Sequence, residues 1–293
     1  MSFAYSYYKG EDLTHTRDAN FVAPVDRTFS EAGGATLIFP RFNIAGTNAR
    51  PLTAFNRISL FQSSGKSEYN GFSIEARRRL SNKFGFIAAY TVSKANDNKP
   101  DQTIVVAGVD DSKIFQNNFD PSADYGRSDL DLRHRFVLSP VYDVGAFSSD
   151  NGAARTLLSN WVFSGIIQAQ SGFAYSAAVT GNPNNDDNSA NDRVSGTSRN
   201  QFTTPNTLQV DLRLTRVFPF GEKYRLTLLG EGFNIFNRSN VSGQNNQFYS
   251  STFNNTTQLG TLTRVNANGA LAFGQPNRFL TERQFQLGIK FEF

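Results

Sequence analysis

The sequence contains no cysteine, which excludes disulfides, thiol chemistry and cysteine-ligated metals. It also lacks a long hydrophobic run, and no stretch approaches the roughly 20 apolar residues of a membrane helix. Charged residues make up only 18% of the 293 residues, whereas soluble domains average about 25%. The net charge of +4 is modest and forms no large cluster. The composition therefore gives no indication of nucleic-acid binding.

Signatures of catalysis are missing as well. The only histidines are His15 and His134, and the position of His134 between two arginines predicts a rim residue rather than a metal ligand or base. Nucleophile, phosphate-loop and dinucleotide motifs are absent. Glu75, Asp211 and Glu231 are interpreted as counter-ions of arginines on polar strand faces. The sequence thus predicts no enzymatic activity, no catalytic residue, no cofactor and no metal ion.

Aromatic residues are abundant at 13%, and the last nine residues show how they are arranged. Apolar and polar residues alternate there without a fault up to the final phenylalanine. Such a period-two pattern predicts a strand with two different environments. An ending of this kind is typical of a strand in a lipid bilayer, with its aromatic face toward the acyl chains. The apolar face consists of Phe285, Leu287, Ile289, Phe291 and Phe293.

Similar alternation recurs along the chain and predicts eight spanning strands. A short apolar run at 58–61 is expected to pair locally inside a long loop. Membrane strands need only about 9–11 residues, half of which face a polar lumen, so a mean hydropathy of −0.41 is compatible with this reading. The predicted strands are near 2–8, 68–80, 83–94, 132–143, 160–177, 204–217, 222–237 and 281–293.

The predicted connections alternate strictly between long and short. Bacterial outer-membrane barrels have long extracellular loops and short periplasmic turns. The fold class is therefore predicted to be all-β: an antiparallel transmembrane β-barrel segment in the outer membrane of a Gram-negative type of bacterium. The first and last strands are expected to be sheet edges. The long connections are 9–67, 95–131, 178–203 and 238–280; the short ones are 81–82, 144–159 and 218–221.

One long loop, Asn182 to Asp192, consists almost wholly of Asn, Asp and small residues. Its spacing lacks the calcium-loop pattern with a bidentate glutamate. It is predicted to be a mobile, solvated loop, and calcium binding is the alternative.

The chain carries an ordered series of motifs. They are Tyr69–Leu80, Phe86–Ala95, Asp131–Val137, Asn160–Gly172, Glu231–Arg238 and the terminal phenylalanine strand. This series resembles the TonB-dependent receptors of the Oar-like type. The resemblance implies a 22-stranded barrel with an N-terminal plug, energised from the inner membrane through the TonB complex. Transporters of this kind do have 22 strands and a plugged lumen.

No plug, TonB box or signal peptide is readable, so residues 1–293 are expected to be a single C-terminal segment of such a barrel. This segment would supply wall and extracellular loops for uptake of a large solute, an iron chelate or an oligosaccharide. The resemblance also implies that the five apolar residues of the last strand form the signal read by the barrel assembly machinery. Expected partners are outer-membrane lipid, that machinery, the solute, and the TonB complex through a plug.

Two alternatives remain open. Eight strands can close on themselves, so a small outer-membrane barrel acting as an adhesin or structural anchor is one. A soluble, secreted, lectin-like β-protein is the other.

Overall fold

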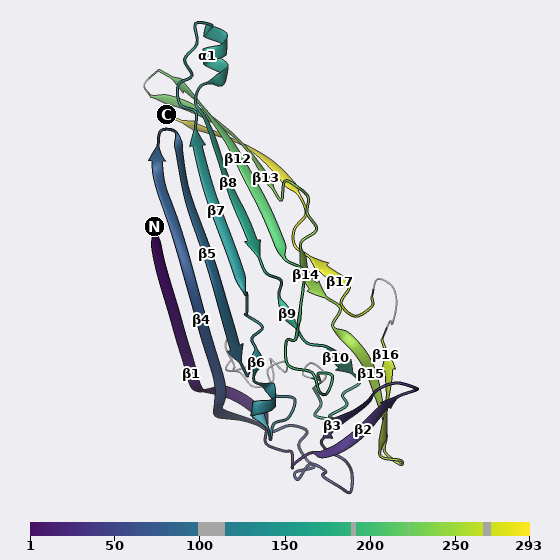
Figure 1. Cartoon of the computed structure of the whole chain (residues 1–293). Helices are drawn as coiled ribbons and strands as arrows, with labels where there is room; N and C mark the ends of the chain where they lie inside the picture. The colour runs from purple at the N-terminus through teal and green to yellow at the C-terminus, as the bar shows by residue number, and fades with distance from the viewer. Residues whose placement is uncertain (99–114, 189–191, 222, 266–270) are drawn as a thin grey trace.

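A computed structural model describes residues 1–98, 115–188, 192–221, 223–265 and 271–293. Eight long strands form one antiparallel sheet in the order β1-β4-β5-β7-β8-β12-β13-β18, and the two-residue β6 (Gly126–Arg127) pairs with the end of β5. Figure 1 shows them side by side as a tall curved wall. The strands are β1 (Ser2–Asp18), β4 (Ser59–Ser81), β5 (Phe84–Asp97), β7 (His134–Asp143), β8 (Trp161–Gln170), β12 (Thr207–Phe220), β13 (Tyr224–Phe233) and β18 (Gln284–Glu292).

The eight strands, and the edge positions of the first and the last, confirm the sequence prediction. The prediction was wrong about the long-loop ends of β1 and β4. The segment 59–61 is not a local pair but the start of β4, and it pairs with the last residues of β1. Polar residues dominate both strands here, so the period-two signal fades although the backbone ladder continues. A register shift between Gly10 and Leu13, with Asp12 at a φ of 55°, marks a bulge. The alternating part of β1 lies before this bulge and the polar part after it.

The strand register aligns like residues across the wall. Gly165, Leu212, Gly232 and Phe285 lie in one row across β8, β12, β13 and β18. The neighbouring row carries polar residues on the opposite face, Ser164, Arg213, Glu231 and Gln286. A slip of one residue in any strand would exchange the two faces. In these rows the wall therefore has one apolar and one polar face.

The short connections all lie at one end of the wall. The β4–β5 turn uses Asn82 and Lys83 with φ of 52° and 71°, and Gly221 at 68° begins the β12–β13 turn. The β7–β8 connection holds α1 (Gly152–Leu158), whose first backbone N–H groups donate to the Asn151 side chain. Among the described residues, no helix has the length and hydropathy needed to cross a membrane.

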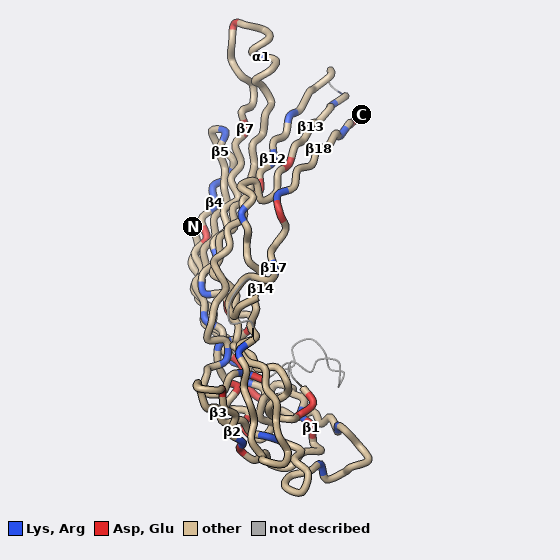
Figure 2. The backbone as a smooth tube through the Cα atoms, turned by 90° about the vertical axis from the view of Figure 1, so that its right-hand side faces the viewer, with Lys and Arg blue, Asp and Glu red and all other residues tan. Residues whose placement is uncertain are grey.

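The long connections lie at the opposite end and fold together into what we call the cap. Their strands form a second sheet in the order β10-β15-β16-β2-β3, with parallel pairing at β10–β15 and at β16–β2. Figures 1 and 2 show this region at the foot of the wall. The sequence prediction of mere loops was wrong here. The strands are β2 (Val25–Glu31), β3 (Thr36–Arg41), β10 (Ala178–Thr180), β15 (Gln247–Asn254) and β16 (Leu259–Arg264).

Short elements complete the cap and its junction with the wall. They are η2 (Pro121–Asp124), β9 (Ala174–Tyr175), β11 (Phe202–Thr203), β14 (Val241–Gln244) and β17 (Pro276–Phe279).

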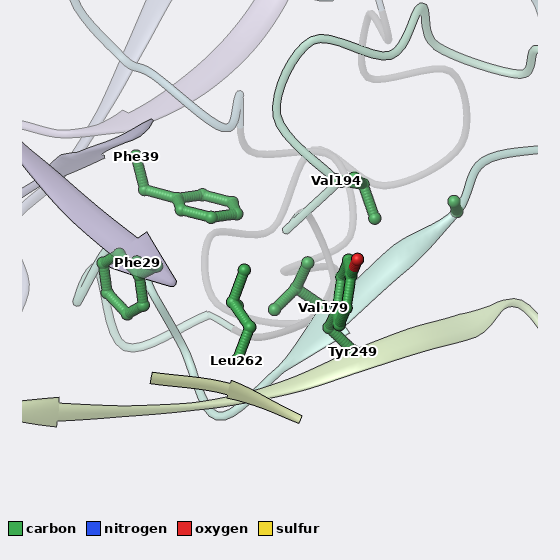
Figure 3. Packing of buried hydrophobic residues seen from close by; sticks show 7 residues of the cluster. Phe29, Phe39, Val179, Val194, Tyr249 and Leu262 are labelled. Atoms are coloured by element: carbon green, nitrogen blue, oxygen red, sulfur yellow. The ribbon is translucent and has the colours of Figure 1, made fainter. Parts of the chain in front are cut away.

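The cap has its own hydrophobic core, drawn in Figure 3. The rings of Phe29 and Phe39 are fully buried and meet edge to face, with centroids 5.2 Å apart. Gly260 allows this packing, because a Cβ on it would lie 2.0 Å from the Phe29 ring. The other buried members are Ala177, Val179, Val194, Tyr249 and Leu262. These residues come from three separate connections, so the core joins them into one body.

Candidate functional site

The apolar face of the wall is open to its surroundings. Leu287 is 90% exposed and Phe293 is 94% exposed, at the outer edge of the sheet. Phe285, Ile289 and Phe291 share that face and are also exposed. The structure thus places four residues of the predicted assembly signal on one face of the edge strand β18, and the fifth, Phe293, directly follows this strand. A bare surface of this extent in water would promote aggregation, whereas lipid would solvate it.

The polar face carries paired charges. Arg213 forms a salt bridge with Glu231, which also accepts a hydrogen bond from Gln286. Asp211 accepts from the Asn234 backbone N–H at 2.8 Å. Glu231 is thus a counter-ion of an arginine, whereas Asp211 holds the end of β13. Glu75, the third carboxylate singled out from the sequence, lies opposite Ala89 in β5.

Buried ion pairs attach the cap to the wall. Asp18, the last residue of β1, receives Arg50 at 2.6 Å, and both side chains are buried. Asp97, the last residue of β5, pairs in the same way with Arg199. The cap therefore meets the wall through carboxylates at strand ends. Sequence reasoning missed these pairs because their partners lie 32 and 102 residues apart.

A model of the outer membrane beta barrel domain family matches residues 1–198 of the chain. The chain belongs to this family. Its location is the outer membrane, and its apolar face is therefore the face toward lipid. No match was found among the curated proteins.

The cap lies at the end of the wall that carries the long loops, where outer-membrane barrels face the exterior. A hollow of about 720 Å³ opens beside the middle of β1 and the first half of β4, and residues 120–122 and 125 close it from the cap side. Its lining mixes Lys9 and Lys66 with Glu11, Glu68 and the ring of Tyr125. Burial, and then the neighbouring Glu68, raise the pKa of Tyr125. Such a lining offers donors, acceptors and one aromatic surface to a polar ligand.

The two histidines occupy different environments. His134 begins β7 at the rim of the wall, and its Nδ1 lies 2.7 Å from the Tyr90 hydroxyl. His15 is fully buried and stacks on Phe115 with ring centroids 3.4 Å apart. The described part of the chain contains no group of three or more His, Asp or Glu side chains suited to a metal ion.

The Asn- and Asp-rich loop was predicted to be solvated, and its described residues are instead packed into the cap; residues 189–191 lie outside the described part. Asn184 is fully buried, and the Asn185 side chain donates to the Phe42 and Asn43 carbonyls. Asn can satisfy backbone groups and also adopt positive φ, as Asn182 and Asn185 do here. These asparagines therefore build a compact loop.

Asp192 is the unusual group of that loop. It is almost completely buried, and among the described residues neither of its carboxylate oxygens has a hydrogen-bond partner. Burial, and then the nearby Asp186, raise its pKa from the usual 3.8 to about 9. At neutral pH this carboxyl group is therefore protonated in the folded cap.

Proposed function

We propose that the chain forms wall and extracellular loops of a TonB-dependent outer-membrane receptor of the Oar-like type, which takes up a large solute. The observation that carries the proposal is the open sheet. Within the described residues β1 and β18 each pair on one side only, although eight strands are enough for a small closed barrel. Unpaired edges inside a membrane are costly, since no water satisfies their backbone groups. Wall strands beyond these eight are needed to close the barrel.

The open sheet also distinguishes this proposal from the adhesin or anchor, which requires β1 to pair with β18. The ordered motifs in β4, β5, β7, β8, β13 and β18 support a receptor of the larger kind. In this proposal the TonB complex acts on a plug domain, and these residues contribute no chemistry. The barrel assembly machinery recognises the apolar face of β18 during insertion.

The cap supports solute recognition. A folded body with its own core holds its surface in a fixed shape, and the hollow beside β1 and β4 offers both charges and an aromatic ring. An iron chelate or an oligosaccharide presents the polar and planar groups that such a lining can bind. Tyr125 is the residue we expect to contact the solute.

The test is uptake by cells that produce the protein, supplied in turn with radiolabelled ferric chelates and oligosaccharides. We expect uptake of one class to require both this protein and a functional TonB complex. Tyr125→Ala should raise the solute concentration needed for half-maximal uptake by about tenfold, the effect of one lost aromatic contact. Uptake that continues without the TonB complex would refute the proposal.

A matched substitution controls for damage to the fold. Tyr142→Ala removes an equally exposed tyrosine at the short-turn end of the wall, far from the hollow. It should leave the half-maximal concentration unchanged. Equal losses from both substitutions would remove Tyr125 from the proposal.

A further inference from the structure

A groove of about 630 Å³ crosses the apolar face of the wall over β7, β8, β12, β13 and β18. It follows the register rows described above, where glycines of β8 and β13 alternate with large residues of β12 and β18. Besides three glycines and Pro140, the apolar residues around it are Tyr142, Phe163, Leu212, Leu214, Ile235, Phe285 and Leu287.

The glycines of the groove differ in what surrounds them. A Cβ on Gly165 would lie 2.8 Å from Leu212 Cδ2, and one on Gly232 would lie 2.9 Å from the Phe285 ring. Those two glycines are needed so that neighbouring side chains can lie across them. Around Gly230 the nearest atom would be 3.5 Å away, an ordinary contact, and its φ is not positive. Neither packing nor backbone conformation requires glycine at position 230. The missing side chain of Gly230 leaves free space on the lipid side of the wall.

A cation lies at the long-loop end of the groove. The Arg283 guanidinium carbon is 5.7 Å from the centroid of the Phe285 ring, which lines the groove. Among the residues that the structure describes, no carboxylate forms a salt bridge with Arg283. Residues 283 and 287 are four apart, or about 13 Å along an extended chain. That length fits within one leaflet of a hydrocarbon core about 30 Å thick.

We propose that the groove binds an acyl chain of an anionic, phosphate-bearing lipid of the outer leaflet, with the lipid phosphate at Arg283. The apolar lining suits a polymethylene chain and offers no partner to a polar group. The unpaired guanidinium at the exterior end complements a phosphate, which arginine binds through two parallel hydrogen bonds. Both features lie on the side of the wall that outer-membrane location turns toward lipid. The proposal depends on that location and not on the solute carried.

The test uses the protein extracted from outer membranes in mild detergent and exchanged into fresh detergent. Lipid A, a bisphosphorylated lipid with several acyl chains, is the probe. Native mass spectrometry counts the lipid A molecules bound at increasing concentrations. We expect one lipid A molecule to stay bound to the unmodified protein at concentrations too low for further lipid A molecules to bind.

Gly230→Leu places a side chain in the free space and should weaken this binding by about 30-fold, because a few methylene groups of the lipid lose their site. Ala88→Leu is the matched control, because Ala88 lies in β5 on the same apolar face of the wall but outside the groove. It should retain the lipid. Equal affinities of the two variants would overturn the proposal.

Arg283→Gln tests the phosphate contact separately and leaves the sheet intact. It should weaken binding by about tenfold, and Arg283→Lys should restore most of the loss because the charge is retained. If Arg283→Gln had no effect on lipid A binding, the proposed lipid site would be contradicted. A doubled protein mass that Gly230→Leu abolishes would contradict it as well. The second result would assign the groove to contact between two copies of the chain.

Discussion

The wall and the cap are made from the same few residue types, and they use them in opposite ways. Phe285 and Phe293 of the wall point away from the protein, whereas Phe29 and Phe39 of the cap are fully buried. The wall thus turns its phenylalanines toward the membrane, and the cap encloses its own against water. Aromatic content therefore says little about a chain until the solvent of each region is known.

Charged residues also differ between the wall and the cap in how far they are exposed. Arg213 and Glu231 pair on the polar face of the wall, where the Arg213 side chain is exposed to the lumen. At the junction with the cap, Arg50 and Arg199 are buried, and each pairs with one buried and one exposed aspartate. Pairs of the first kind contribute little to stability, whereas removal of one partner from a buried pair is costly. The arrangement of the cap thus depends on its buried polar contacts and on one small core.

The largest expected effect is in the cap core. Phe29→Ala leaves a cavity at a fully buried site and should lower the free energy of unfolding of the cap by about 3–5 kcal/mol. Hydrogen exchange with mass spectrometry should show lost protection in β2, β3, β15 and β16 and unchanged protection in β5 and β7. Phe285→Ala on the wall is the control and should leave the cap protected. Simultaneous loss of protection in β5 would mean that cap and wall are one cooperative unit.

The second effect compares the two faces of the wall. Leu214→Arg puts a charge on the lipid face near the middle of β12 and should cost about 2–4 kcal/mol, while Thr215→Arg, facing the lumen, should cost little. The free energy of unfolding in lipid vesicles, measured with urea, distinguishes them. Equal costs would show that the assigned faces are wrong.

The third effect is a pH dependence confined to the cap. The pKa of Asp192 is raised in the folded state to about 9 from 3.8, so the folded cap binds a proton that the unfolded chain releases. The stabilisation is complete below about pH 4 and is lost as the pH rises through 9. The expected slope is at most about 1.4 kcal/mol per pH unit.

Cap opening free energies from hydrogen exchange at pH 5 to 8 measure this slope. Asp192→Asn cannot titrate, so it should flatten the slope. A slope that persists in this variant would assign the titration to another group.

The wall could be predicted from the sequence because one local rule, alternation with a period of two, determines which residues face lipid. The terminal residues from Phe285 to Phe293 follow that rule without exception. It failed for residues 9–18, since outside the membrane both sides of a strand meet water or loops and no alternation is selected.

The cap could not be predicted in this way. Its pairing of β2 with β16 joins residues more than 200 positions apart, and the sequences of its strands do not alternate strictly between apolar and polar residues. The asparagines of 182–188 carried a turn signal, yet their burial depends on distant partners such as Phe42 and Gln116. The role of the last strand as an assembly signal stays a prediction.

The central claim is that the eight-stranded sheet is a membrane wall with lipid on its apolar face. Because the chain contains no cysteine, single cysteines can be placed at each position from 208 to 215 in β12 and labelled in outer membranes. A lipid-soluble maleimide should react at Leu208, Val210, Leu212 and Leu214, and a water-soluble one at the other four positions of this range. Uniform reaction with the water-soluble reagent along this strand would contradict the claim.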